Sequence, residues 1–324
     1  MMQIFKTLQV LIYLFLIPLS LLSSIQRGNV DIPIAEITVS KGFDYAHCFV
    51  SGGNPFLFCY DSHTGKAALW NMFGENTPIQ TIALGTNWNV FEFVNHENNC
   101  DLITLSNGGR VRLTKNILSK SISIAHSFEE DFSDRWSLSK LFPHIDSHYL
   151  LSYSKETGTI LINTLHHSES FSLRKTNVVQ IEPDWDNLQL VENNNNFIVL
   201  KQCKKNNRIV VERASKNGQM ISENLFNNIF QGADIFELKP TANWTNANLV
   251  LANQKVMLFL YCSSNGEVQI LLQNDSEKSF TDIYKTKWSK GWSQFEVIYL
   301  NGDPHLFHYK ESTGLARISK ISID

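Results

Sequence analysis

Two aspartates flank a tryptophan in the stretch Asp184-Trp185-Asp186, and this combination can bind a sugar. An indole ring stacks on the apolar face of a sugar, while carboxylates accept hydrogen bonds from its hydroxyl groups. A tryptophan at this place can equally belong to a hydrophobic core, and the aspartates are then ordinary surface residues. The regular recurrence of tryptophan described below favours the core interpretation.

Residue types that bind metals occur in two short clusters. Glu129-Glu130-Asp131 offers carboxylate oxygens of the kind that calcium prefers, although a solvated turn has the same composition. His166 and His167 are adjacent, so in a strand they point to opposite faces and cannot clamp one ion. The sequence therefore assigns no metal-binding residue.

Catalytic and cofactor-binding motifs are absent from the sequence. Neither the Gly-x-Ser-x-Gly elbow of serine hydrolases nor the His-Glu-x-x-His zinc motif occurs. His305 and His308 are expected on opposite faces of one strand, where packing explains them better than catalysis. Gly52-Gly53 is expected at a hairpin turn and does not indicate a phosphate-binding loop. We therefore assign no catalytic residue and no cofactor.

The length and charge of the chain exclude some classes of protein. The chain has 324 residues and a formal net charge of −3, which gives no argument for nucleic acid or an anionic membrane as partner. Lys6 precedes an apolar run over residues 8–22, with small residues up to Ser24. This layout predicts a signal peptide over residues 1–24 and a secreted or periplasmic chain over 25–324, not inserted in a membrane. An uncleaved N-terminal anchor is the alternative, because the residue two positions before Ser24 is a leucine.

Five cysteines are spread along the chain, so at least one thiol is unpaired whatever the compartment. Cys48 and Cys59 would face each other across a hairpin that turns near Gly53-Asn54. This spacing predicts a Cys48–Cys59 disulfide, and two small buried side chains are the alternative.

A repeat of about 48 residues organises the rest of the chain. Four segments share an apolar run that ends in tyrosine, a glycine five residues later, and an aromatic residue seventeen residues before the tyrosine. The four runs end at Tyr60, Tyr153, Tyr261 and Tyr309. Two further copies, around Leu105 and Gln202, keep the tryptophan but lack the tyrosine and the glycine. The six aromatic anchors are Phe43, Trp88, Trp136, Trp185, Trp244 and Trp292.

Each copy is expected to form four antiparallel strands. The first strand starts at the anchor, the second ends at the tyrosine, and the third follows the glycine. A more polar fourth strand leads to the next anchor. Four strands in 45–50 residues make one blade, so we predict an all-β, six-bladed β-propeller. The last copy lacks its outer strand, which residues 32–39 can supply to close the ring, and an insertion is expected over residues 222–236.

The best copy carries a resemblance to a known group of proteins. It contains Gly291-Trp292 and Phe295, then the run that ends at Tyr309, then Gly314. This pattern resembles the Trp…Phe…Tyr…Gly repeats of secreted β-propeller proteins and, in layout only, lectins of the tachylectin and tectonin kind. The resemblance covers residues 32–324 and implies the architecture. It transfers no site residues. Six-bladed sialidases are not indicated, because their Asp-containing turn motif is missing.

Three functions fit such a chain. The first is a ligand-binding module, with glycans as ligand and repeated sites expected in blades 1, 3, 5 and 6. The second is a protein–protein scaffold at a cell surface. The third is a hydrolase or lyase with one site at the channel mouth. Equivalent aromatic clefts would favour the first, an apolar patch the second, and a charged channel with shifted pKa values the third.

Overall fold

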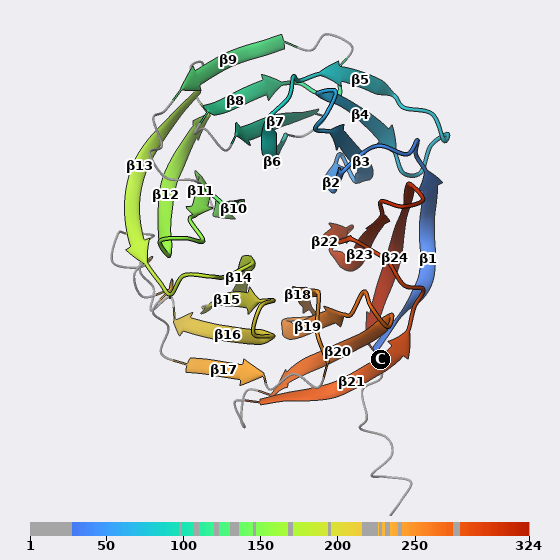
Figure 1. The fold of residues 1–324 in the computed structure, drawn as a ribbon, viewed down its shortest axis with the longest axis vertical. Coiled ribbons are helices and arrows are strands. Elements are labelled where there is room, and N and C mark those ends of the chain that lie inside the picture. The colour runs from blue at the N-terminus through green and yellow to red at the C-terminus, as the bar shows by residue number, and fades with distance from the viewer. Residues whose placement is uncertain are drawn as a thin grey trace, which may run out of the picture.

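The computed structural model describes residues 28–96, 99–106, 110–119, 123–129, 136–144, 147–167, 171–193, 196–215, 226, 229–230, 234–238, 242–274 and 279–323. Within these residues, strands β1 to β24 form six four-stranded antiparallel sheets around a central opening (Figure 1). The predicted all-β, six-bladed β-propeller is confirmed. No helix among these residues is long and apolar enough to cross a bilayer.

We number the blades in chain order and give the strands of each blade from the channel outward. Blade 1 consists of β2 (Tyr45–Ser51), β3 (Asn54–Asp61), β4 (Lys66–Asn71) and β5 (Gln80–Ala83). Blade 2 consists of β6 (Trp88–His96), β7 (Asn99–Ser106), β8 (Arg110–Lys115) and β9 (Ser123–Glu129). Blade 3 consists of β10 (Leu138–His144), β11 (Ser147–Tyr153), β12 (Thr159–His167) and β13 (Phe171–Gln180). Blade 4 consists of β14 (Asn187–Asn193), β15 (Asn196–Cys203), β16 (Arg208–Ser215) and β17 (Asp234–Leu238). Blade 5 consists of β18 (Asn246–Ala252), β19 (Lys255–Tyr261), β20 (Glu267–Asn274) and β21 (Ser279–Lys287). Blade 6 consists of β22 (Gln294–Leu300), β23 (Asp303–Lys310), β24 (Leu315–Ile323) and β1 (Gly28–Thr38).

The aromatic anchors belong to the core between blades. The five tryptophan anchors are buried and Phe43 is half-buried. Trp292, for example, packs in one cluster with Phe259 and Tyr261 of the preceding blade. Five of the innermost strands begin two residues after their anchor. The chain bends at this point, so that the aromatic side chain of the anchor packs against the neighbouring blade. The expectation that these strands start at the anchor was wrong by two residues. Only β6 starts at its anchor, Trp88.

The repeated glycine lies where two backbones meet. Gly65, Gly158, Gly266 and Gly314 all have φ between +70° and +76°. The carbonyl of Gly314 accepts a hydrogen bond from the Val39 amide at 2.9 Å. A Cβ at Gly314 would lie 2.2 Å from the Val39 carbonyl oxygen. Both the left-handed backbone and the close approach therefore require glycine.

The repeated tyrosine joins each blade to the next. Its hydroxyl donates a hydrogen bond to a backbone carbonyl at or shortly before the following anchor. The pairs are Tyr60–Gly85 (2.8 Å), Tyr153–Glu182 (3.2 Å), Tyr261–Ser289 (3.0 Å) and Tyr309–Phe43 (3.2 Å). The last pair joins blade 6 to blade 1. The tyrosine is therefore a structural residue of the blade interface.

Blade 4 keeps the same two contacts with different residues. Gln202 occupies the tyrosine position, and its amide donates to the Trp244 carbonyl at 2.9 Å. Asn207 occupies the glycine position with φ +55°, and its side-chain oxygen accepts from the Trp244 amide at 3.1 Å. Asparagine tolerates a positive φ better than most residues. Gln202 and Asn207 thus replace the tyrosine and the glycine and keep hydrogen bonds between blades 4 and 5.

The first strand closes the ring as predicted. β1 pairs antiparallel with β24, from Gly28 opposite Ile323 to Thr38 opposite Leu315. The chain's first described strand thereby completes the last blade, and no edge of the ring is left open between blades 6 and 1 (Figure 1). The signal peptide expected over residues 1–24 lies outside the described residues.

The strand register gives no support to the Cys48–Cys59 disulfide. Cys48 lies opposite Leu57 and Cys59 opposite Ala46, so the two cysteines are diagonal and not directly facing. Diagonal positions are about 7–8 Å apart, and a disulfide needs Cα atoms within about 7 Å. Both side chains are buried and unbonded in the structure. The expected direct pairing was therefore wrong by two residues.

The long interval before Trp244 adds to the core. The insertion expected over residues 222–236 overlaps β17, which begins at Asp234. Before β17, Phe226, Ile229 and Phe230 are described, and all three are buried. They pack in the cluster between blades 3 and 4, where Phe226 meets the ring of Tyr149 at 5.3 Å.

Candidate functional site: the central channel

Most residues that suggested chemistry in the sequence lie in the core or away from the channel, but Asp186 lines the channel at the end where the innermost strands begin. Trp185 is 2% exposed, so it cannot stack on a sugar. Asp186 is occupied by the Lys155 ammonium group and by the Lys204 amide. His305 and His308 are both buried, as the core interpretation predicted. No metal-binding cluster occurs within the described ranges.

Of the acidic cluster at residues 129–131, Glu129 is the last residue of β9, and the other two residues lie outside the described part of the chain. His166 and His167 end β12. Neither cluster is brought together with other ligating residues by what the structure describes.

Six equivalent positions meet in the middle of the channel. They are the residues four places after each anchor, one per blade. We call this ring the waist, and it consists of His47, Glu92, Lys140, Gln189, Asn248 and Glu296. The waist residue of blades 2, 4 and 6 accepts from a backbone N–H of the following blade and is paired with the waist residue of that blade. The waist is therefore a ring of three pairs.

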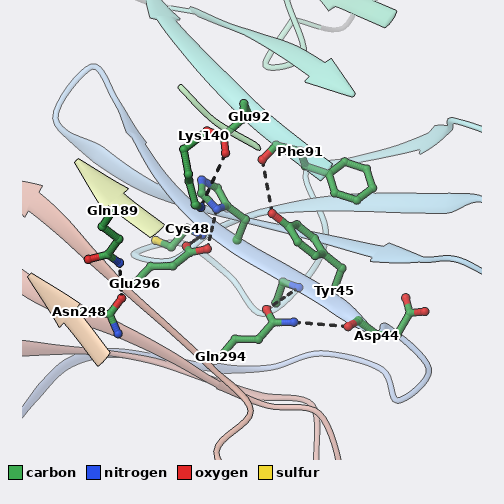
Figure 2. Close-up of polar contacts among 12 residues, drawn as sticks. Asp44, Tyr45, Cys48, Phe91, Glu92, Lys140, Gln189, Asn248, Gln294 and Glu296 are labelled. Atoms are coloured by element: carbon green, nitrogen blue, oxygen red, sulfur yellow. Dashed lines mark hydrogen bonds and ion pairs between the residues drawn. The ribbon is translucent and has the colours of Figure 1, made fainter. Parts of the chain in front are cut away.

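The first pair joins blades 6 and 1. One carboxylate oxygen of Glu296 lies 2.6 Å from Nδ1 of His47, and the other accepts from the Cys48 amide at 2.9 Å (Figure 2). The His47 ring stacks on Phe93 of blade 2 at 4.7 Å between centroids. Both oxygens of Glu296 are thus used in holding the neighbouring strand.

The other two pairs repeat the arrangement. The Gln189 amide donates to Asn248 at 2.7 Å and its oxygen accepts from the Leu249 amide at 2.8 Å. Glu92 accepts from the Leu141 amide and lies 3.6 Å from the Lys140 ammonium (Figure 2). An innermost strand has one unpaired edge, and these side chains satisfy backbone N–H groups on it.

The two carboxyl groups of the waist are shifted in opposite directions. Burial raises the pKa of Glu92, and the nearby Lys140 and His47 offset this only in part. Burial also acts to raise the pKa of Glu296, but its contacts with His47 and with the Cys48 amide outweigh burial and lower it. The Lys140 ammonium has a raised pKa, chiefly because of Glu92. The ionisable residues of the waist lie in blades 6, 1, 2 and 3, and the amides Gln189 and Asn248 lie in blades 4 and 5.

A cavity of about 280 Å³ opens at the end of the channel where the innermost strands begin. We call it the vestibule. Side-chain amides from blades 4, 5 and 6 are the most frequent polar groups of its wall, and Tyr45 of blade 1 also lines it. The charged residues of the wall are Lys140, Asp186, Lys204 and Glu296. The amides are those of Asn187, Gln189, Gln202, Asn246, Asn248 and Gln294. The pattern amide-x-amide at the second and fourth residues after the anchor occurs in blades 4 and 5, and amide-x-glutamate in blade 6.

A larger cavity of about 460 Å³ opens where the innermost strands end. We call it the chamber. The waist forms its floor, and the residues five places after each anchor line its wall. These are Cys48, Phe93, Leu141, Leu190, Leu249 and Val297. Tyr299 lies at its rim, is 40% exposed, and is held by the Leu251 amide at 3.0 Å.

Sequence reasoning missed the channel because its residues carry no motif. The signal was nevertheless present in the repeat. Once the anchors are aligned, polar residues occur at the fourth position after every anchor, although a buried face of a strand would be apolar.

Comparison with known proteins gives evidence for the fold only. No family model and no curated protein matches the sequence. The crystal structure of BBS1N in complex with ARL6DN is similar with a TM-score of 0.50, 12% identity, and coverage of 92% of this chain and 97% of that chain. The WD40 domain of SCAP from fission yeast has a TM-score of 0.46, 9% identity, and coverage of 82% and 81%. The chain is a six-bladed β-propeller with a polar, asymmetric channel.

Proposed function

We propose that this chain is a secreted ligand-binding module that holds one neutral carbohydrate unit in its vestibule. The observation that carries the proposal is the wall of side-chain amides from three consecutive blades. Amide groups offer both donors and acceptors, which match the hydroxyl groups of a sugar without a charge. A cavity with a few convergent polar groups is the usual form of a small-ligand site.

The ligand is expected at one site and not at repeated sites. The tyrosines of blades 1, 3, 5 and 6 and the tryptophan anchors are buried between blades. The aromatic repeat therefore builds the interfaces and offers no set of equivalent aromatic clefts.

Export of the chain fits the same proposal. The apolar run at residues 8–22 ends before β1, which begins at Gly28. Cleavage after Ser24 would remove the apolar run and leave β1 whole.

The test uses the chain recovered from the culture medium. Its N-terminal residue shows whether the signal peptide was cleaved, and a glycan-array screen shows whether the chain binds a sugar. Binding that a free sugar competes is then measured by calorimetry in Asn246→Ala. We expect about tenfold weaker binding, because a hydrogen bond to the sugar is lost. Thr281→Ala, on exposed β21 of the same blade, is the matched control and should bind normally. A blank array, or equal binding by both variants, would reject the vestibule as a sugar site.

A protein-interaction scaffold is the second candidate. The propeller fold is used in this way by BBS1N, which was solved in complex with ARL6DN. In this chain, Phe73 and Ile79 are each 52% exposed on the loop between β4 and β5. A blank glycan array would move this candidate to first place.

The hydrolase or lyase alternative was expected to show a charged channel with shifted pKa values, and the waist has these features. Its carboxylate oxygens, however, accept hydrogen bonds from backbone amides of the next blade. We therefore interpret these charges as groups that join the blades.

A further inference from the structure

We propose that the chamber is a second binding site, separate from the vestibule, for an uncharged ligand with an apolar body and a carbonyl or hydroxyl oxygen at its tip. The proposal does not depend on the carbohydrate site. It rests on the wall, the floor and the charge of the chamber.

The wall of the chamber suits an apolar body. Every blade contributes the residue five places after its anchor, and five of these six residues are Phe, Leu or Val. Tyr299 at the rim is fixed in position by its hydrogen bond from the Leu251 amide. Burial of apolar ligand surface against this wall favours binding. A volume of about 460 Å³ is in the range of small-molecule sites.

The floor of the chamber has donors to spare, whereas most of its acceptors are already used. The exception is Glu92, which accepts from the Leu141 amide and lies 3.6 Å from the Lys140 ammonium. The oxygens of Glu296 serve His47 and the Cys48 amide, and the oxygen of Gln189 serves the Leu249 amide. Lys140 has three N–H donors, its ion-pair partner Glu92 is at the long distance of 3.6 Å, and its side chain is 44% exposed. A ligand that reaches the floor can therefore bring an acceptor to Lys140.

The charges around Lys140 favour a neutral acceptor. A ligand carboxylate would be a third negative charge beside Glu92 and Glu296. A ligand amine would compete with Lys140 for Glu92. A carbonyl or hydroxyl oxygen accepts from the Lys140 ammonium without either cost.

Three probes with one skeleton separate these possibilities. Phenylacetamide, phenylacetate and phenethylamine present a neutral acceptor, an anion and a cation on the same apolar body. We expect phenylacetamide to bind most tightly in a titration followed by calorimetry at neutral pH. Lys140→Met should weaken it about tenfold, because a hydrogen bond from a charged donor is lost. Lys41→Met, at an exposed position outside the channel, should bind it normally.

Two further variants test whether the probe binds in the chamber. Leu190→Trp fills the chamber without changing its charge and should abolish binding of phenylacetamide even if Lys140→Met alters the fold. Asn246→Ala in the vestibule should leave that binding unchanged. Preference for phenylacetate or phenethylamine, no binding of any probe, or binding that survives Leu190→Trp would overturn the proposal.

Discussion

At the scale of single residues, the repeat is best explained by contacts between blades. Gly314, Tyr309 and Trp292 each contact the neighbouring blade or its connection. Each residue type is required by a different constraint: a positive φ, a hydroxyl donor at fixed length, and a large ring that fills the interface. A repeat of this kind reports the fold of the molecule and carries no direct information on its ligand.

Gly314→Ala tests the close backbone approach. Gly302 is the matched control, because its φ is +85° and an added Cβ meets nothing within 4 Å. Gly302→Ala should cost about 1–2 kcal/mol, which is the strain of the left-handed backbone alone. Gly314→Ala should cost about 3 kcal/mol or more, because its Cβ also meets the Val39 carbonyl. Urea unfolding measures both, and equal costs would contradict the role given to the approach.

At the scale of strands, the innermost strands have two tasks. They pack in the blade interfaces and they line the channel. Because successive side chains of a strand point to opposite faces, the residue four places after the anchor contributes to the waist and the next residue to the chamber wall. The hydrogen bonds of the waist replace part of the strand pairing that an inner edge lacks. The outermost strands have a simpler task, and only β1 comes from the far end of the chain.

Removal of β1 tests its part in closing the ring. A chain that begins at Val39 lacks the partner of β24 and exposes the cluster in which Ile37 is buried. We expect its unfolding midpoint to fall by more than about 10 °C, since each kcal/mol shifts a large domain by about 2–4 °C. A synthetic peptide of residues 28–38 should restore part of the loss. An unchanged midpoint would show that β24 does not need this partner.

The strands and the ring closure could be predicted from the sequence, because turn residues and apolar runs recur with the anchors. The pairs of the waist could not. Glu296 and His47 are 249 positions apart, and their pairing depends on how the ring closes in space. Gln202 and Asn207 were also missed, since replacement of a hydroxyl by an amide, or of glycine by asparagine, leaves no trace in a search for identical residues.

At the scale of the whole molecule, the waist links stability to pH. The lowered pKa of Glu296 means that its contribution is present above the ordinary pKa of a glutamate, about 4.3. That contribution is lost as the pH falls through the lower, folded-state value. Glu92 has the opposite sign, because burial raises its pKa and its ionisation disfavours the folded state.

Glu296→Gln should therefore reduce stability at pH 7 and flatten its decline on acidification below about pH 5. Urea unfolding at constant ionic strength from pH 7 to pH 3 measures this difference. Glu75→Gln changes an exposed carboxylate on the loop after β4 and should keep the wild-type profile. If the two variants gave the same profile, Glu296 would not contribute through its ionised form.

The pairing of β1 with β24 also determines when blade 6 can form during synthesis of the chain. Among the described strands, β1 leaves the ribosome first and β24 last, so blade 6 cannot form until β24 has been made. Blades 1 to 5 consist of consecutive strands and can assemble as they emerge, whereas the ring stays open meanwhile. The final step joins residues nearly 300 positions apart (Gly28 and Ile323), a contact of high loop-closure entropy. Closure is thus a checkpoint that a chain passes only when it contains both β1 and β24.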